Sequence, residues 1–198
     1  MKHHDVEERL IDRTIQVIAE EGLEKTTTKA IVKGTNINEA YIYRFFEDKD
    51  DLLRKTFDSL DNELVKVSIE SASLMTETTG SSKEKARSMF VTVWRFLLGN
   101  SAKCLSYIRY FYSPYFKKYS VESHTDRYRP LVDIFSVEFK AEANVWMLLN
   151  HIFNVMLDFA VKVFNGQVPD NDDTEEHVFR LVFQSIEQYF KKEEASLS

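Results

Sequence analysis

A chain of 198 residues with 43% hydrophobic content and no tract rich in Pro or Gly is not a largely disordered protein, and its length suits one or two domains. The net charge of −6 argues against broad affinity for nucleic acid, and no run of about 18 apolar residues predicts a transmembrane helix. The single cysteine, Cys104, excludes an intrachain disulfide. It suits a reducing cytoplasm, where we expect the protein because its first ten residues resemble no secretory signal.

Helical periodicity dominates the sequence and no alternating strand pattern stands out, so we expect an all-α fold. The first helix is expected at about 5–21, with Gly22 as its stop. A run of three threonines then precedes a short helix, because a threonine hydroxyl can cap free backbone N–H groups. This short helix is expected to direct Ile31 and Val32 inward.

A second short helix is predicted after a tight turn. We expect Asn36 to take the left-handed conformation there, since asparagine tolerates it better than most residues. Asn38 can cap the helix, which runs through Ile42 to Phe46. Two short helices joined in this way form a helix-turn-helix, and the second helix of that motif enters the major groove of DNA.

Long helices are predicted for the rest of the chain. Asp48 can cap one that runs to about residue 73, and Ser81 with Glu84 forms a capping-box pattern within a linker at 76–82. Further helices are expected at about 81–98, at 101–119 with an interruption at Pro114, from about 122 with a limit or kink at Pro130, at 142–165, and at 174–192.

The predicted helix at 142–165 is apolar around most of its circumference. Its polar residues gather in one narrow stripe, which includes His151, Asn154 and Asp158. Because a surface helix has a narrower apolar stripe, we expect a second copy of the chain to cover part of this helix and of the last helix in a two-fold four-helix interface. The expected interface residues are Val145, Leu149, Ile152, Met156, Phe159, Val163, Val178, Leu181, Val182, Ile186 and Tyr189.

The first quarter of the sequence carries a set of residues at characteristic spacing. They are Ile11, Ile15, Ile18, Ala19, Glu21, Gly22, Leu23, Thr26, Thr27, Ile31, Val32, Ile37, Ile42, Tyr43, Phe45, Phe46, Lys49 and Leu52. In this pattern the chain resembles the tetracycline-repressor (TetR) family of bacterial transcriptional regulators. The resemblance implies a three-helix DNA-binding domain at 1–48 and a helical effector-binding and dimerisation domain at 49–198.

The predicted DNA-binding residues lie on the two short helices and directly after them. Residues that project away from the inward side of the second helix can face bases, and the resemblance implies that others touch phosphates. The predicted set is Thr27, Thr28, Asn38, Glu39, Ala40, Tyr41, Tyr43, Arg44 and Lys49, with phosphate contacts implied for Thr27, Thr28, Tyr43 and Lys49. Glu39 departs from the family, whose members often have a basic or small residue there. Phosphates repel a carboxylate unless it accepts from a cytosine amino group.

Aromatic residues are dense between Trp94 and Tyr119. They favour either an apolar ligand cavity with hydroxyl groups at its edge or an ordinary core. The resemblance implies an effector pocket in the helical body, for a small molecule that is largely apolar or aromatic. The candidate lining residues are Trp94, Tyr107, Tyr110, Phe111, Tyr115, Trp146 and Phe153, and Arg95 and Arg109 are candidates for an anionic group.

Other chemistry is not indicated. The five histidines share no ligand-type spacing, so we expect no metal or cofactor, and no catalytic motif predicts an enzyme. The primary hypothesis is a homodimeric repressor that binds a near-palindromic DNA operator and is released by a small-molecule effector. The alternative is a helical effector- or protein-binding module of the same fold that has lost DNA binding, for which Glu39 and the acidic balance argue.

Overall fold

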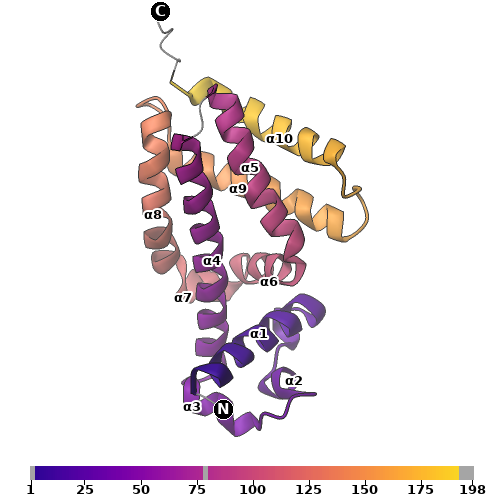
Figure 1. The fold of residues 1–198 in the computed structure, drawn as a ribbon. Coiled ribbons are helices and arrows are strands. Elements are labelled where there is room, and N and C mark those ends of the chain that lie inside the picture. Colours follow the sequence, from indigo (N-terminus) through magenta and orange to yellow (C-terminus); the bar gives the residue numbers. More distant parts are fainter. Residues whose placement is uncertain (1–2, 78–79, 192–198) are drawn as a thin grey trace, which may run out of the picture. The chain divides into compact units, whose positions relative to one another are not determined.

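The computed structural model describes residues 3–77 and 80–191, and the side chains of 6–73 and 80–191 within them. Over these residues the chain is helical, with an isolated β-bridge between Phe139 and Phe190, so the predicted all-α class is confirmed. The elements in Figure 1 are α1 (His3–Glu21), η1 (Leu23–Lys25), α2 (Thr28–Val32), η2 (Glu39–Tyr41), α3 (Ile42–Phe45), α4 (Lys49–Glu77), α5 (Ser82–Gly99), α6 (Ser101–Phe111), α7 (Pro114–Tyr119), α8 (Val121–Glu138), α9 (Val145–Phe164), α10 (Asp172–Ile186) and η3 (Glu187–Tyr189), where η denotes a 3-10 helix.

Local signals fix most helix boundaries as predicted. Gly22, with a φ of +90°, ends α1. The Ser81 N–H donates to Glu84 Oε2 (2.8 Å) and the Glu84 N–H donates to Ser81 Oγ (3.3 Å), which is the capping box expected before α5. The expected linker at 76–82 is shorter in the structure, because α4 continues to Glu77. Two of its residues, at 78 and 79, lie outside the described part of the chain.

The chain packs as two compact units. One, which we name the helix-turn-helix unit, consists of Met1–Glu63 and Asn100–Asp126, and the other, the body unit, consists of Leu64–Gly99 and Arg127–Ser198. The packing boundaries therefore differ from the predicted division after residue 48. The reason is that the beginning of α4, together with α6, α7 and the beginning of α8, packs with the amino-terminal helices.

Helix α6 covers the back of α1 inside the helix-turn-helix unit. The Ser106 hydroxyl donates to the Ile15 carbonyl (2.7 Å), and the Arg109 guanidinium donates to the carbonyls of Ile18 and Ala19, the latter at 2.9 Å. Carbonyls in the last turn of a helix lack partners within the helix, so a cation there is favourable. Arg109 therefore has a structural role in the described chain, whereas the sequence suggested an anionic ligand.

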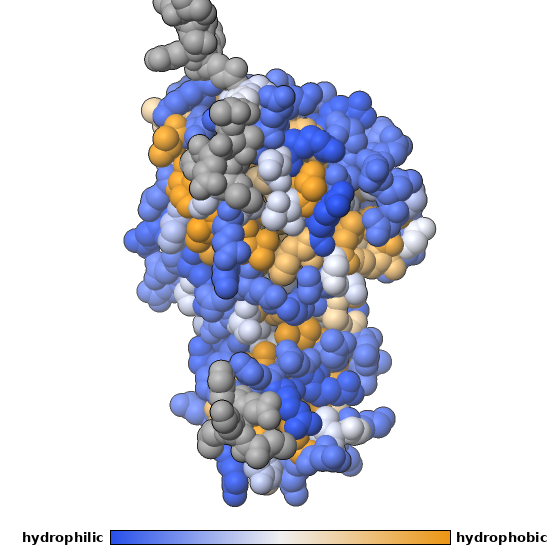
Figure 2. Space-filling model, in the orientation of Figure 1, coloured by the Kyte–Doolittle hydropathy of each residue, from blue (hydrophilic) through white to orange (hydrophobic). Residues whose placement is uncertain are grey.

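Helices α5, α9 and α10 pack against one another in the body unit and bury apolar faces between them (Figure 1). Asparagine side chains begin two of them, since Asn144 accepts from the Met147 N–H (3.1 Å) and Asn171 accepts from the Thr174 N–H (2.9 Å). The visible face of the surface is mostly hydrophilic, with hydrophobic residues in separated patches (Figure 2).

Helix α10 ends earlier than the sequence predicts. It stops at Ile186 instead of near residue 192, and after η3 the backbone of Phe190 is extended, with φ −66° and ψ 146°. The Lys140 N–H donates to the Tyr189 carbonyl (2.8 Å) and the Lys191 N–H donates to the Glu138 carbonyl (3.0 Å). This pairing with the end of α8 replaces further helical bonds. Lys192, the predicted end, lies outside the described residues.

Candidate nucleic-acid interface

The first short helix of the motif, α2, begins as predicted at the threonine run. Thr27 caps it, because the Thr27 Oγ1 accepts from the Ala30 N–H at 3.1 Å. Thr26 is buried and its hydroxyl donates to the Gly22 carbonyl (2.9 Å), which ties the start of α2 to the end of α1. Ile31 is fully buried. The predicted inward position of Ile31 is confirmed.

Gly34, and not Asn36, provides the left-handed residue of the turn. Gly34 has a φ of +75°, whereas no described non-glycine residue has a positive φ, so the expectation for Asn36 is wrong. Thr35 completes the turn, because its hydroxyl donates to the Val32 carbonyl (2.7 Å) and accepts from the Ile37 N–H (3.1 Å). The hydroxyl thus satisfies groups that the turn removes from helical bonding.

The recognition segment is a 3-10 turn, η2, that continues into α3. Asn38 caps it as predicted, with its Oδ1 accepting from the Ala40 N–H at 2.9 Å. The inward residues of this segment form the core of the motif together with residues of α1, α2 and α4. This core comprises Val6, Leu10, Ile31, Ile37, Ile42, Phe46 and Leu52, all buried. The predicted inward set of Ile37, Ile42 and Phe46 is confirmed.

The opposite side of the recognition segment is open to solvent. Tyr41 and Tyr43 are 41% and 59% exposed, which is unusual for aromatic residues of a small domain. The Arg44 guanidinium lies 4.8 Å from the centre of the Tyr41 ring, so the two side chains hold each other at the surface. Lys29 and Lys33 are exposed on and after α2. Hydroxyls and cations on one exposed helix face are the groups that contact phosphates and base edges.

Glu39 is held within the motif. Its carboxylate accepts a hydrogen bond from the Thr28 hydroxyl, which links the start of α2 to the start of the recognition segment, and both side chains are half-buried. The carboxylate is therefore partly satisfied inside the protein, and it helps to fix the angle between the two short helices. Thr28 and Glu39 were predicted to face DNA, whereas the structure shows them bonded to each other.

The junction between α3 and α4 is held by side chains of α4. The Lys55 ammonium donates to the Phe45 carbonyl (3.2 Å) at the end of α3, and the Asp51 carboxylate accepts from the Glu47 N–H (3.2 Å) and from Arg54 (2.7 Å). Burial by itself raises the pKa of the Asp51 carboxyl, but the hydrogen bonds from Arg54, Glu47 and Lys55 outweigh burial and lower its pKa. The end of the recognition segment is thus fixed to α4. Lys49 lies at the first turn of α4, with its ammonium 5.8 Å from the Tyr115 ring centre.

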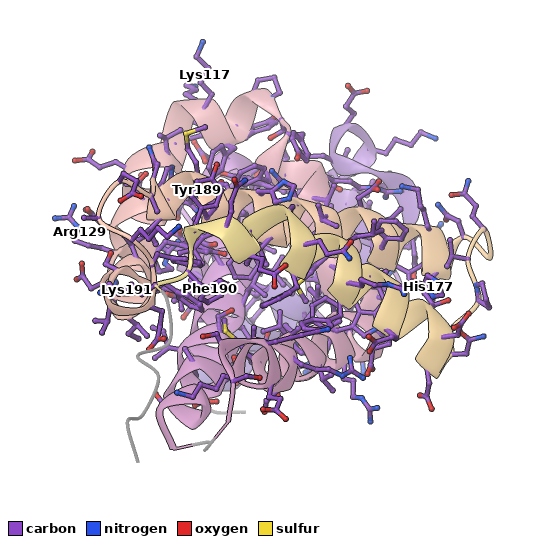
Figure 3. All side chains as sticks on the ribbon, turned by 90° about the horizontal axis from the view of Figure 1, so that it is seen from above. Lys117, Arg129, His177, Tyr189, Phe190 and Lys191 are labelled. Carbon is purple, nitrogen blue, oxygen red and sulfur yellow. The ribbon has the colours of Figure 1, made fainter. Side chains whose placement is uncertain are left out.

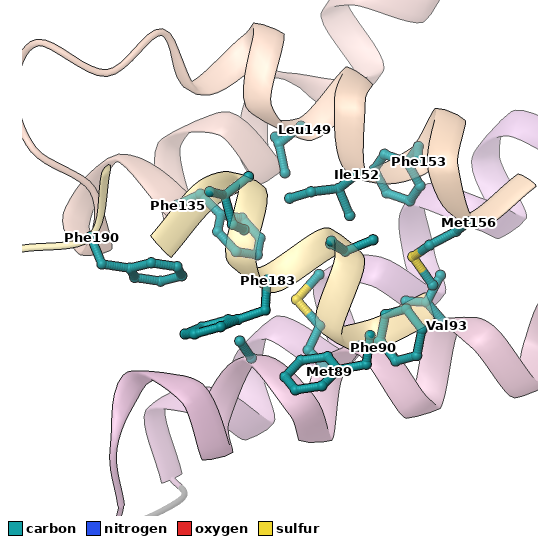
Figure 4. Close-up of a pocket in the computed structure, with 14 residues that line it drawn as sticks. Met89, Phe90, Val93, Phe135, Leu149, Ile152, Phe153, Met156, Phe183 and Phe190 are labelled. Atoms are coloured by element: carbon teal, nitrogen blue, oxygen red, sulfur yellow. The ribbon is translucent and has the colours of Figure 1, made fainter. Parts of the chain in front are cut away.

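The body unit contains an apolar cavity of about 50 Å³ between α5, α8, α9 and α10 (Figure 4). It is lined by Ala86, Met89, Phe90, Val93, Phe135, Leu149, Ile152, Phe153, Met156, Phe179, Val182, Phe183, Ile186 and Phe190. Every lining residue is apolar. The cavity therefore suits hydrocarbon and offers no side-chain partner to a polar group.

Of the seven aromatic residues predicted to line an effector pocket, only Phe153 lines this cavity. Tyr107, Tyr110, Phe111 and Tyr115 belong to the helix-turn-helix unit and form an aromatic cluster there, in which Tyr110 stacks on Phe57 with ring centres 4.6 Å apart. None of these four residues lines the cavity of the body unit; Tyr107 and Tyr110 are buried, and Phe111 and Tyr115 are half-buried. Trp94 is buried against Phe90, and the ring centres of Trp146 and Tyr128 lie 6.1 Å apart. Arg95, the other candidate for an anion, pairs with Glu175.

The sequence did not predict most of the cavity residues. The signal that was available is the inward face of α10, where Phe179, Val182, Phe183 and Ile186 follow the helical period. Two of these residues, Val182 and Ile186, were assigned to a partner subunit instead. The structure shows that this face packs within its own chain.

Six of the eleven predicted interface residues are buried inside the body unit. They are Val145, Leu149, Met156, Val178, Val182 and Ile186, and each of them packs within its own chain. Ile152, Phe159, Val163 and Tyr189 are half-buried, and Leu181 is 52% exposed. The polar stripe of α9 is exposed as predicted, and its His151 Nε2 lies 2.8 Å from the Ser185 hydroxyl of α10.

Among the described helices, only α9 is long and apolar enough to cross a membrane by length and composition. The core helix of a soluble protein passes the same test, and six residues of α9 are buried in the body unit. The described residues contain no group of three or more His, Cys, Asp or Glu side chains that could hold a metal ion.

The sequence and the fold were compared with those of known proteins. Residues 10–56 match the family described as bacterial regulatory proteins, tetR family. No curated protein matches the sequence. Among solved structures, a TetR-family transcription regulator from Marinobacter aquaeolei VT8 is similar over 97% of this chain and 100% of its own, with a TM-score of 0.78 and 17% identity.

Two further similar structures are regulators named FadR. The fatty acid degradation regulator FadR from Bacillus halodurans has a TM-score of 0.66 and 18% identity over 92% of this chain and 96% of its own. FadR from Bacillus subtilis, in complex with stearoyl-CoA, has a TM-score of 0.67 and 20% identity over 88% of this chain and 96% of its own. At these identities the likeness shows a shared fold. Residues 10–56 therefore carry the sequence pattern of the tetR family of bacterial regulatory proteins, and the whole chain shares the fold of solved tetR-family regulators.

Proposed function

We propose that the protein is a homodimeric, cytoplasmic transcriptional repressor whose helix-turn-helix binds a near-palindromic operator, and that a small hydrocarbon-containing effector releases it. The observation that carries the proposal is the exposure of Tyr41, Tyr43 and Arg44 on a recognition segment whose other side is buried. Solvent-exposed aromatic rings of this kind on a rigid scaffold suit contact with a ligand surface. The match of residues 10–56 to a family of regulators supports DNA as that surface.

Dimerisation supplies the second recognition segment. The two copies would enter successive major grooves about 34–36 Å apart on one side of the operator. Leu181 of α10 and Met147 of α9 are large apolar side chains that are 52% and 65% exposed, and they support an interface on the outer face of these helices. The proposed dimer is held by that outer face, since the inward residues are already used.

The effector is proposed to place an apolar segment in the cavity of the body unit. Its fully apolar lining supports a hydrocarbon group, and the likeness of the fold to FadR in complex with stearoyl-CoA supports an acyl chain in particular. Such an effector would regulate only through different affinities for the DNA-competent and DNA-incompetent conformations. Helices α4 and α8 each contribute residues to both units, so they are the proposed path of the signal.

Binding to DNA from the region upstream of the protein's own gene tests the proposal. We expect a site-specific complex by fluorescence anisotropy, with an affinity that falls steeply as salt increases. The double variant Tyr43→Ala/Lys49→Ala should weaken binding to all sequences and reduce the slope of log K against log salt by about one for the lost lysine contact.

The matched control is Tyr112→Ala/Lys66→Ala, which removes the same residue types from exposed positions outside the two short helices α2 and α3 and the first turn of α4. It should leave DNA affinity unchanged. Equal losses in the two double variants, or the absence of a specific complex at low salt, would contradict DNA binding through this surface.

The alternative of a module that has lost DNA binding rested on the negative charge at Glu39. Because the Thr28 hydroxyl donates to this carboxylate, Glu39 has a structural role that is compatible with DNA binding. The structure therefore supports the repressor over the module.

A further inference from the structure

The carboxy-terminal end of the described chain contributes one residue, Phe190, to the lining of the apolar cavity of the body unit. We refer to residues Glu187–Lys191, which comprise η3 and the two residues after it, as the strap. Figure 3 shows its last three residues, Tyr189, Phe190 and Lys191, where the chain leaves α10. The strap belongs to the body unit, as do all cavity residues.

The Glu187 N–H donates to the Phe183 carbonyl of α10, and the other hydrogen bonds between the strap and the rest of the body unit join it to the chain at the end of α8. Besides the two backbone bonds from Lys140 to Tyr189 and from Lys191 to Glu138, the Lys140 ammonium donates to the Gln188 carbonyl (2.6 Å) and the Lys191 ammonium to the Val137 carbonyl (2.5 Å). Glu187, Gln188 and Lys191 are exposed. Bonds of this kind, close to solvent at the end of an element, open at low free-energy cost compared with the interior of a long helix.

Phe190 is the strap residue that lines the cavity. It is only 8% exposed, and its ring lies 4.6 Å from Phe139 and 5.8 Å from Phe183, measured between ring centres. Figure 4 shows it at one end of the lining, beside Phe135 and Phe183. Neighbouring Tyr189 is half-buried and does not line the cavity. One aromatic side chain on a weakly held segment therefore forms one wall of an otherwise helical cavity.

The size of the cavity requires that a wall move before a ligand enters. Small-molecule sites usually have volumes of about 300–1,000 Å³, whereas this cavity has about 50 Å³. The other walls are residues of α5, α8, α9 and α10, whose backbones are held by successive helical bonds. Withdrawal of Phe190 enlarges the space without breaking a helix. We propose that the strap is the lid of the cavity, and that Phe190 moves out to admit the hydrocarbon segment of the effector.

The lining also defines the chemistry of what enters. Six phenylalanines and eight aliphatic or thioether side chains offer contact but no side-chain hydrogen bond. A polar group drawn inside would lose its hydrogen bonds to water without replacement. The segment beneath the strap is therefore a bare hydrocarbon chain, and any charged group of the same molecule stays outside. This inference rests on the proposed effector binding and specifies its entrance.

A reversible crosslink tests the lid directly. Glu138 and Lys191 flank the bridged pair Phe139 and Phe190, and the Lys191 N–H donates to the Glu138 carbonyl. Residues opposite each other in this way have Cα atoms about 5.5 Å apart, which is within the range of a disulfide. In the variant Glu138→Cys/Lys191→Cys, oxidation locks the strap and reduction frees it, while Phe190 is unchanged. The natural Cys104 does not compete, because burial raises the pKa of its thiol to about 12 and keeps it protonated.

Uptake of N-phenyl-1-naphthylamine, an uncharged fluorescent hydrocarbon-like probe, is measured by stopped flow in both states. We expect uptake by the oxidised variant to be slower than by the reduced variant by about tenfold or more, as for a closed lid, and the reduced variant to match the unmodified protein. Equal rates in the two states would overturn the lid. Far-ultraviolet circular dichroism of the oxidised protein verifies that the fold is intact.

A second variant tests the role of the Phe190 side chain. Phe190→Ala should speed uptake by about tenfold, because the wall is then open, and the matched control Tyr189→Ala, a change of the adjacent strap aromatic, should leave the rate as it was. An equal acceleration in both would show that loss of strap packing in general, and not removal of the Phe190 ring, opens the cavity, which contradicts the assignment of Phe190.

DNA binding is measured on the same samples, so failure of the lid and failure of the proposed repressor give different results. If oxidation slows uptake of the probe but the protein does not bind the operator, the result supports the lid and contradicts the repressor. If the protein binds the operator but takes up the probe at the same rate in the oxidised and reduced states, the result supports the repressor and overturns the lid. Absence of probe binding in both redox states would show that the cavity admits no such ligand, and this also overturns the lid.

Discussion

The hydrogen bond between Thr28 and Glu39 changes the role that is assigned to Glu39. In the sequence, an acidic residue on the recognition segment argues against DNA, because phosphates repel it. In the structure, the Thr28 hydroxyl donates to its carboxylate, so the same residue stiffens the motif. The two residues are eleven positions apart, beyond the reach of any helical periodicity.

The turn glycine provides the first prediction at this scale. Gly34 has a φ of +75° with no heavy atom within 4 Å of an added Cβ, so the only cost of a side chain is the backbone conformation. Gly34→Ala should lower the free energy of unfolding by about 1–2 kcal/mol, measured by urea denaturation. Gly99→Ala, at the end of α5 and equally open, is the matched control and should not destabilise the protein. Equal losses at the two positions would contradict the assigned backbone conformation.

At the scale of elements, the sequence identified helices well where their signals are local. Gly22, the Ser81–Glu84 capping box and the Asn38 cap each act within a few residues, and the structure confirms them. The end of α10 was wrong because its cause is not local. The residues after Ile186 are compatible with a helix, and only pairing with residues about fifty positions earlier, at the end of α8, draws them into an extended strap.

The start of α4 gives a prediction about pH. The pKa of Asp51 is lowered in the folded state, so its contribution to stability is complete above the unfolded pKa, about 3.9, and is lost as the pH falls through the folded pKa. Asp51→Asn should reduce the free energy of unfolding by about 0.5–1 kcal/mol near neutral pH, and the difference from the unmodified protein should vanish in acid.

Asp133→Asn, a change of an exposed aspartate in α8, controls for general effects of removing one negative charge. The measurement is urea denaturation at a series of pH values from neutral to about 3. An Asp51→Asn penalty that persists undiminished in acid would show that the carboxylate is not the stabilising species.

At the scale of the whole molecule, the sequence predicted the fold class and the binding motif. It did not predict in which unit each aromatic residue packs. Tyr107, Tyr110 and Phe111 lie close in sequence to Trp94, yet they pack in the other unit. Likewise, α9 and α10 are apolar on faces that the sequence assigned to a partner and that the chain itself buries. Which apolar face meets which neighbour depends on tertiary packing, which periodicity alone does not contain.

The remaining outer face of α9 and α10 provides the prediction for the assembly. Leu181→Glu places a charge at an exposed apolar site of the proposed interface and should shift the protein from dimer to monomer by sedimentation equilibrium, with DNA affinity reduced in parallel. Val137→Glu makes the same change at a 67% exposed valine of α8 and should leave the dimer intact. A dimer that tolerates Leu181→Glu at micromolar concentration would place the interface elsewhere.

The docking of α6 on α1 has a consequence for biosynthesis. Because Ser106 and Arg109 bind carbonyls of α1, the helix-turn-helix unit is assembled from two stretches of chain that are separated by residues 64–99. Helix α1 is synthesised well before α6. The surface of α1 that α6 covers therefore stays exposed until the later segment has been synthesised. The amino-terminal helices of this unit are therefore synthesised well before the segment that covers them, and the unit is among the later parts to mature. A nascent chain that stops before residue 100 exposes that surface to chaperones and proteases.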